Sequence, residues 1–151
     1  MSLPIRLMHT MLRVVDMDRT LAFYCGHLGM TIAIDRRDPD GYRNVFVGCG
    51  VATGGPVLEF GARPGLMPNT GSEGFDHIAL ETTDVQDLCE RLRAAGVVIQ
   101  RDVKRAQSGA LIAIIEDPDG YRIELIQPNP QASPERPAPV VQPRSSGRSR
   151  G

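Results

Sequence analysis

Apolar residues in the first sixty positions recur with two spacings, one typical of strands and one typical of helices. Alternation at every second position predicts four strands, over residues 7–15, 30–35, 42–47 and 57–60. Apolar residues three or four positions apart predict one helix over residues 17–28, with Asp16 as its N-cap and Gly29 at its end. The predicted order of this half is therefore β-α-β-β-β.

The same order returns in the second half of the chain. Residues 61–75 are rich in Gly and Pro and have no apolar period, which predicts a surface linker. A helix is predicted over residues 85–95, between the cap Asp84 and the terminating Gly96. Strands are predicted over residues 76–83, 97–101, 110–115 and 122–126. The pattern predicts an α+β domain over residues 1–127, built from paired βαβββ modules at 7–60 and 76–127.

Equivalent residues of the two modules are separated by a nearly constant number of positions, as expected of an internal repeat. His9 and His77 are 68 positions apart, and Glu59 and Glu124 are 65 apart. Each module therefore has one His in its first strand and one Glu in its last strand. Period two also puts Glu124 on the strand face opposite the apolar Ile123 and Leu125.

A second repetition has a different spacing. The hexapeptide Asp-Pro-Asp-Gly-Tyr-Arg occurs at residues 38–43 and again at 117–122, which are 79 positions apart. This register would put the two His and the two Glu out of correspondence. We interpret the hexapeptide as turn chemistry used twice, because Pro fixes φ near −65° and Gly accepts positive φ.

Composition excludes several classes of protein. Residues 1–127 carry 13 basic and 17 acidic side chains, and aromatic residues make up 5% of the chain with no Trp, so nucleic-acid binding is disfavoured. The three cysteines, Cys25, Cys49 and Cys89, are widely spaced and odd in number, which predicts reduced thiols and a cytoplasmic location. The first ten residues contain no long apolar run, so neither a signal peptide nor a membrane span is predicted.

The last part of the chain differs from the rest. Residues 128–151 hold six of the twelve Pro and four Arg, without an apolar period. This composition predicts a disordered tail that takes no part in the fold.

Four side chains carry the chemistry that the repeat brings into correspondence: His9, Glu59, His77 and Glu124. Taken singly, each is typical of a half-buried or solvated strand residue. If the modules pack as duplicates around a shared cleft, two imidazoles and two carboxylates converge. Two neutral nitrogens and two carboxylate oxygens suit a divalent ion such as Zn, Ni or Co at about 2.0–2.2 Å.

Four segments carry a resemblance to a known family. They are His9-Thr-Met-Leu-Arg13, Phe23-Tyr24…Leu28-Gly-Met30, Asp76-His-Ile-Ala-Leu80 and Glu116-Asp-Pro-Asp-Gly-Tyr-Arg-Ile-Glu-Leu-Ile126. Over about residues 6–127 the chain resembles the short bacterial form of glyoxalase I (lactoylglutathione lyase), in the vicinal-oxygen-chelate superfamily of glyoxalases, bleomycin-resistance proteins and dioxygenases.

The resemblance implies a fold and a ligand set. It implies that the paired modules form a curved mixed sheet with a cleft, and that His9, Glu59, His77 and Glu124 bind one divalent ion per site, Ni, Co or Zn. It also implies a homodimer whose active sites are shared between two chains. Dioxygenases and thiol transferases of the superfamily typically use two His and one Glu, so the fourth ligand, Glu59, favours the isomerase branch.

The reaction that the resemblance implies is isomerisation of the methylglyoxal–glutathione hemithioacetal to S-D-lactoylglutathione through a cis-enediolate at the metal. A free carboxylate is too weak a base to remove the C–H proton quickly unaided, because its pKa is near 4.3. Glu124 is expected to act as the base, with Glu59 as the candidate on the other face.

Candidate substrate contacts come from four basic residues. The resemblance assigns Arg13 to the glutathione carboxylate; otherwise it is a surface residue or pairs with Glu81. Arg63 stands in the segment Glu59-Phe-Gly-Ala-Arg63, where the family usually has Asn, and Arg105 opens the segment where a Lys-Gly pair is usual. Arg63, Lys104 or Arg105 is therefore expected to compensate, or the substrate carries a different thiol or none.

Two alternatives stay open. One is a metalloenzyme of the same superfamily, an isomerase or epimerase, that acts on another substrate with vicinal oxygens. The other is a metal-free binding protein of the bleomycin-resistance type, which would not need the four ligands.

Overall fold

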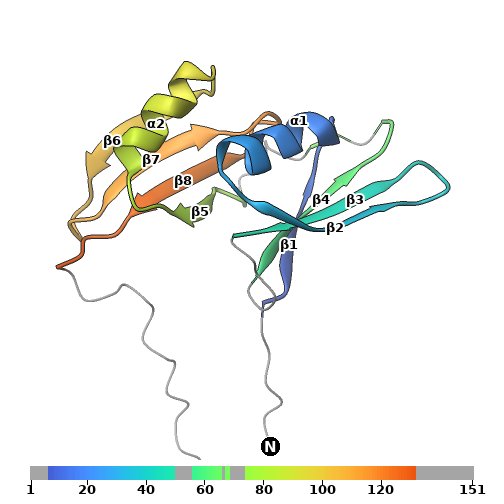
Figure 1. The fold of residues 1–151 in the computed structure, drawn as a ribbon, viewed down its shortest axis with the longest axis horizontal. Coiled ribbons are helices and arrows are strands. Elements are labelled where there is room, and N and C mark those ends of the chain that lie inside the picture. Colours follow the sequence, from blue (N-terminus) through green and yellow to red (C-terminus); the bar gives the residue numbers. More distant parts are fainter. Residues whose placement is uncertain (1–6, 50–55, 66, 69–73, 132–151) are drawn as a thin grey trace, which may run out of the picture.

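Two four-stranded sheets lie side by side, and the helices lie above them in the view of Figure 1. The computed structural model describes residues 7–49, 56–65, 67–68 and 74–131. Most of the expected tail, residues 132–151, lies outside this range, as do residues 66 and 69–73 of the expected linker. In the described part of the chain, no helix combines the length and apolar character needed to cross a membrane.

The first module follows the predicted order. Its elements are β1 (His9–Arg13), α1 (Met17–Leu21), η1 (Ala22–His27), β2 (Thr31–Arg37), β3 (Arg43–Gly48) and β4 (Val57–Ala62). The strands form a mixed sheet in the order β1-β4-β3-β2, in which β1 is parallel to β4 and the other pairs are antiparallel. Asp16 caps α1 by accepting the amides of Asp18 and Arg19 at 3.0 and 3.1 Å, as expected of an N-cap.

The second module repeats this topology. Its elements are β5 (Ile78–Glu81), α2 (Val85–Ala94), β6 (Ile99–Arg105), β7 (Leu111–Glu116) and β8 (Arg122–Gln127). The sheet order is β5-β8-β7-β6, with β5 parallel to β8. The order of the strands confirms the paired βαβββ prediction, because β5 and β8 occupy the places that β1 and β4 occupy in the first sheet.

Several element boundaries differ from the prediction by one to four residues, and three of the differences have a visible cause. The helix expected over residues 17–28 changes to a π-helix from Ala22, and the Leu28 amide donates to the Phe23 carbonyl five residues earlier. Strand β4 continues to Ala62, because Gly61 and Ala62 still pair with β3. Strand β6 continues to Arg105, four residues past its expected end, because its last residues still pair with β7.

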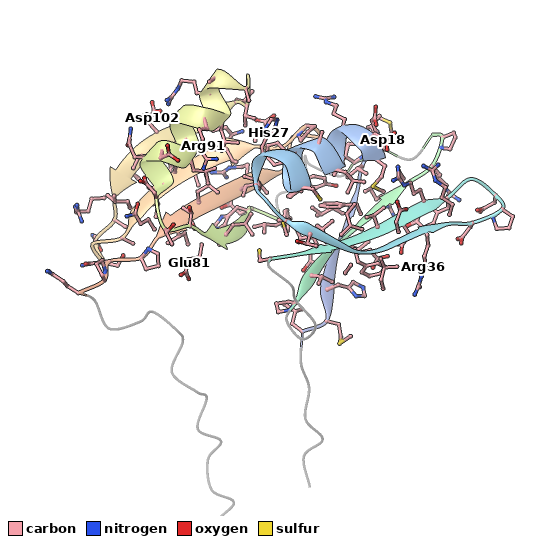
Figure 2. The ribbon with its side chains drawn as sticks, in the orientation of Figure 1. Asp18, His27, Arg36, Glu81, Arg91 and Asp102 are labelled. Atoms are coloured by element: carbon pink, nitrogen blue, oxygen red, sulfur yellow. The ribbon has the colours of Figure 1, made fainter. Side chains whose placement is uncertain are left out.

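One apolar core joins the two modules. Buried aliphatic and aromatic side chains from both sheets and both helices form a single cluster. Ile123 and Leu125 are buried in it, and Glu124 between them lies on the opposite face, as the period predicted. On the side away from the helices, the sheets are open to solvent, and Figure 2 shows Arg36 of β2 and Glu81 of β5 on this side.

Candidate metal centre

His9 and Glu59 form a close pair, called here the first half-site. The parallel pairing of β1 with β4 sets Met11 opposite Glu59, so Glu59 and His9 extend from the same face of the sheet. His9 Nε2 lies 2.9 Å from Glu59 Oε2. The amide of Asn44, on β3, donates a hydrogen bond to the other oxygen of Glu59. This contact holds the carboxylate in place, and the Glu59 side chain is 15% exposed.

His77 and Glu124 form the second half-site in the second sheet. His77 directly precedes β5, which is parallel to β8, and its Nε2 lies 3.2 Å from Glu124 Oε2. On the other side of the ring, His77 Nδ1 lies 2.7 Å from Asp76 Oδ2, and Arg122 pairs with the second oxygen of Asp76. The hydrogen bond with His77, together with the charge of Arg122, holds the pKa of Asp76 below its usual range.

The two half-sites are equivalent in the repeat and separate in space. Among the described residues, no three His, Cys, Asp or Glu side chains lie close enough together to hold one metal ion. The described part of one chain therefore does not bring all four candidate ligands together. The structure brings His9 to Glu59 and His77 to Glu124, and each pair offers one nitrogen and one oxygen.

The spacing inside each half-site fits two neighbouring ligands of one ion. Two donors that each lie about 2.1 Å from an ion, at a right angle to each other, are about 3.0 Å apart. The nitrogen-to-oxygen distances of 2.9 and 3.2 Å in the two half-sites are close to this value. Each pair can therefore bind one ion without a large movement of its side chains.

The environment of His77 also fits a cation at Nε2. In the tautomer that carries its proton on Nδ1, between the ring and Asp76, the Nε2 lone pair faces the Glu124 carboxylate. A lone pair and a carboxylate oxygen repel each other unless a proton or a metal ion lies between them. A carboxylate behind a ligating imidazole is a common outer contact of metal centres. The second half-site therefore has the chemistry of a metal ligand pair.

Arg13 lies on the sheet face that carries the first half-site. It stands four residues beyond His9 on β1, and Gly61 of β4 is its neighbour across the sheet. Its side chain is exposed, and it forms no ion pair with any described residue, Glu81 included. The guanidinium is therefore available to an anionic group on this face.

The other candidate contacts lie in two places. Arg63 follows β4 and lines a hollow of about 540 Å³ with Arg37, Arg43 and residues at the start of α1. Lys104 and Arg105 end β6 in the other sheet, where Arg105 donates to the Gly109 carbonyl at 2.8 Å. One chain therefore does not gather these basic residues around one half-site.

Sequence reasoning missed the residues that hold the candidate ligands. Asp76 directly precedes His77, and this adjacency was a usable signal for a carboxylate behind an imidazole. Asn44 had no comparable signal, because its contact with Glu59 depends on the register between β3 and β4. Only the fold shows that contact.

Comparison with known proteins places the chain in a family. A family model described as the Glyoxalase/Bleomycin resistance protein/Dioxygenase superfamily matches residues 6–125, and the chain belongs to this superfamily. A probable lactoylglutathione lyase from Synechocystis sp. is 40% identical over 123 residues, covering 80% of this chain and 94% of that protein. A lactoylglutathione lyase from Salmonella typhimurium is 40% identical over 124 residues, covering 81% and 92%.

A solved structure agrees with these relatives. The trypanothione-dependent glyoxalase I of Leishmania major superposes with a TM-score of 0.71 at 37% identity, covering 82% of this chain and 86% of that one. The vicinal-oxygen-chelate fold and the resemblance to bacterial glyoxalase I are thereby confirmed.

Proposed function

We propose that the chain is a metal-dependent lactoylglutathione lyase that converts the hemithioacetal of methylglyoxal and glutathione into S-D-lactoylglutathione. The observation that carries the proposal is the pair of equivalent half-sites, each with an imidazole nitrogen and a carboxylate oxygen about one ligand spacing apart. The identity to bacterial lactoylglutathione lyases over most of the chain supports the same activity. Free Cys25, Cys49 and Cys89 favour the cytoplasm as its compartment.

His9, Glu59, His77 and Glu124 are the residues that would hold the divalent ion. When bound, the ion would supply Lewis-acid stabilisation of the negative charge that develops on two neighbouring substrate oxygens. Imidazole and carboxylate ligands suit Ni, Co and Zn alike, so the donor set admits all three metals.

Glu124 is the better candidate for the base. Glu59 is contacted by both His9 and Asn44, whereas His77 is the one ion-pair partner of the Glu124 carboxylate among the described residues. Across the sheet, the neighbours of Glu124 are Ala79 on β5 and Ile114 on β7. These side chains offer no competing proton. Glu124 would take the proton from the hemithioacetal carbon and return it to the adjacent carbon.

Two chains would complete each site. A two-fold dimer in which the first half-site of one chain faces the second half-site of the other forms two identical four-ligand centres. The side chains that neighbour Glu59 across the first sheet also favour contact with a partner chain. They are apolar, and they include exposed Met11, Phe46 and exposed Ile34. Exposed apolar side chains around the first half-site form a surface that a second chain would cover.

Arg13 would bind a carboxylate of the glutathione moiety. It lies on the same face as the first half-site, about 13 Å along β1 from His9. Arg63 would add a second positive charge near the start of α1. Lys104 and Arg105 lie on the second module. In a shared site we therefore assign them to the chain that supplies the second half-site.

The test is thioester formation from methylglyoxal and glutathione by metal-stripped protein that is given Ni, Co or Zn in turn. We expect turnover that depends on the metal. Glu124→Gln should bind metal and lose turnover, because an amide cannot accept the carbon proton. Glu81→Gln is the matched control, since Glu81 lies on the same face of the neighbouring strand, and it should remain active. Activity of Glu124→Gln within tenfold of the unaltered protein would overturn the assignment of the base.

The same experiment separates the alternatives. Tight metal binding without thioester formation would indicate a superfamily metalloenzyme for another vicinal-oxygen substrate. Arg63 and Arg105, which stand where the family usually has other residues, would then explain the different substrate. Protein that takes up no metal would indicate a binding protein of the bleomycin-resistance type.

A further inference from the structure

The repeated hexapeptide has the same backbone in both copies but different surroundings. In the β2–β3 turn (38–43) and the β7–β8 turn (117–122), the first Asp amide donates to the Tyr carbonyl, at 2.8 and 2.9 Å. The Gly amide donates to the first Asp carbonyl in both, at 3.0 and 3.1 Å, and both Gly have positive φ, 85° and 91°. The β2–β3 turn projects into solvent, whereas the β7–β8 turn packs against the first module.

Asp117 is the buried centre of the β7–β8 turn. Its side chain is in the core, where the residue is 4% exposed, and one oxygen accepts the Tyr24 hydroxyl at 2.8 Å. Its other oxygen accepts the amides of Asp119 and Tyr121 at 2.9 and 2.8 Å. Tyr24 is fully buried in η1, so this bond joins the two modules inside the core.

Two further residues of the turn reach the first module. Asp119 accepts the Val15 amide at 3.1 Å and the Thr20 hydroxyl at 3.3 Å. The Tyr121 hydroxyl donates to the Arg13 carbonyl at 2.9 Å. With the bond from Tyr24, four hydrogen bonds connect this turn to the end of β1 and to the helix that follows it.

These bonds join β1 and β8, two of the strands that carry candidate ligands. Arg13 is the last residue of β1, which begins at His9, and Arg122 is the first residue of β8, which carries Glu124. The turn therefore fixes the end of one ligand strand against the start of the other. The spacing and angle between the half-sites of one chain depend on this junction.

In a two-fold dimer this internal spacing matters for both sites at once. Each chain presents its two half-sites to the two opposite half-sites of its partner, and both centres close only if the spacing within each chain matches. We propose that the β7–β8 turn is a positioning element of the metal centre, acting through β1 and β8. This inference rests on the proposed function, because it needs a metal shared by the half-sites.

The β2–β3 turn supplies a matched control. Asp119→Ala removes the acceptor for Val15 and Thr20. Asp40→Ala makes the same change at the equivalent position, where the local Tyr42 amide, at 3.2 Å, is the one donor to the Asp40 side chain among the described residues. Both variants are compared with the unaltered full chain by Co(II) titration of metal-stripped protein. The visible Co(II) spectrum is recorded, and circular dichroism establishes that each protein is folded at the temperature used.

We expect Asp119→Ala to bind Co(II) about tenfold more weakly with an altered Co(II) spectrum, as for loss of an outer contact of a metal site, and Asp40→Ala to stay within about twofold. Tyr121→Phe, which keeps the ring and removes only the hydroxyl, should weaken binding in the same direction and serves if Asp119→Ala does not fold. Unchanged affinity and spectrum in a folded variant would overturn the inference and leave the proposed function standing. An unaltered protein that binds no Co(II) would overturn both.

Discussion

Tyr24→Phe tests the buried bond between the modules with the smallest possible change. The substitution removes one hydroxyl and keeps the ring that packs on Phe60 at a centroid distance of 4.6 Å. A hydrogen bond to a charged group contributes about 1.5–3 kcal/mol. Asp117 keeps its two amide donors, so the carboxylate is not left without partners. We expect a loss of about 2 kcal/mol in the free energy of unfolding.

The loss of unfolding free energy in Tyr24→Phe should depend on pH, and the structure gives the sign of this dependence. Burial raises the pKa of Asp117, and hydrogen bonds from the Tyr121 amide, the Tyr24 hydroxyl and the Asp119 amide lower it in part. Removing the Tyr24 hydroxyl raises this pKa further. Between the ordinary and the raised pKa the native state holds more protons than the unfolded chain, so stability falls as pH rises through this window.

The variant therefore loses most stability above that window. Below the ordinary pKa of an Asp, the carboxyl is neutral in both states and the deleted bond is a weaker one, so the difference between the two proteins shrinks as pH falls. Urea unfolding of metal-free protein at fixed chain concentration, followed from neutral to acidic pH, measures this difference.

Tyr42→Phe is the matched control, because the Tyr42 hydroxyl has no hydrogen bond to a described residue and its loss should cost less than about 0.5 kcal/mol. Equal losses in Tyr24→Phe and Tyr42→Phe, or a Tyr24→Phe difference that grows toward acidic pH, would refute the reasoning.

Three further predictions concern the ligand face. Gly61→Ala should change the free energy of unfolding by less than about 1 kcal/mol in urea unfolding, because the added Cβ would meet only the far ends of the Tyr42 and Met11 side chains, which can move aside; a larger loss would contradict this. Asn44→Ala should weaken metal binding about tenfold in calorimetric titration, because Glu59 loses its donor; unchanged binding would contradict the role of that contact. Ni at about 100 times its Kd should stabilise the chelator-treated protein by about 2.7 kcal/mol, seen as a higher melting temperature that EDTA reverses.

The order of elements and the faces of the strands were predictable because they depend on local spacing. Period two put Glu124 opposite Ile123 and Leu125, and their burial confirms it. The predicted end of strand β6 came four residues too early, and the reason is also local. Its register with β7 shifts between Ile99 and Arg101 and again before Lys104, and such irregularities break the alternation that marks a strand.

The junction between the modules was not predictable from spacing. The Asp-Pro-Asp-Gly turns are alike in sequence and in backbone, yet only Asp117 has a buried partner, 93 positions away in the chain. A periodic pattern shows which face a side chain occupies but not which distant residue meets it. For the same reason, the four candidate ligands were identified, whereas their division into two separate pairs was visible only in the fold.

Mixing two inactive variants tests the central claim most directly, namely that each active site takes one half-site from each of two chains. Glu59→Gln disables the first half-site and Glu124→Gln the second. In a mixed dimer, one site carries both defects and the other carries none. After subunit exchange in equal amounts, we predict thioester formation at about a quarter of the unaltered activity, since half of the dimers are mixed and each has one intact site. A mixture no more active than the separate variants would contradict the shared site.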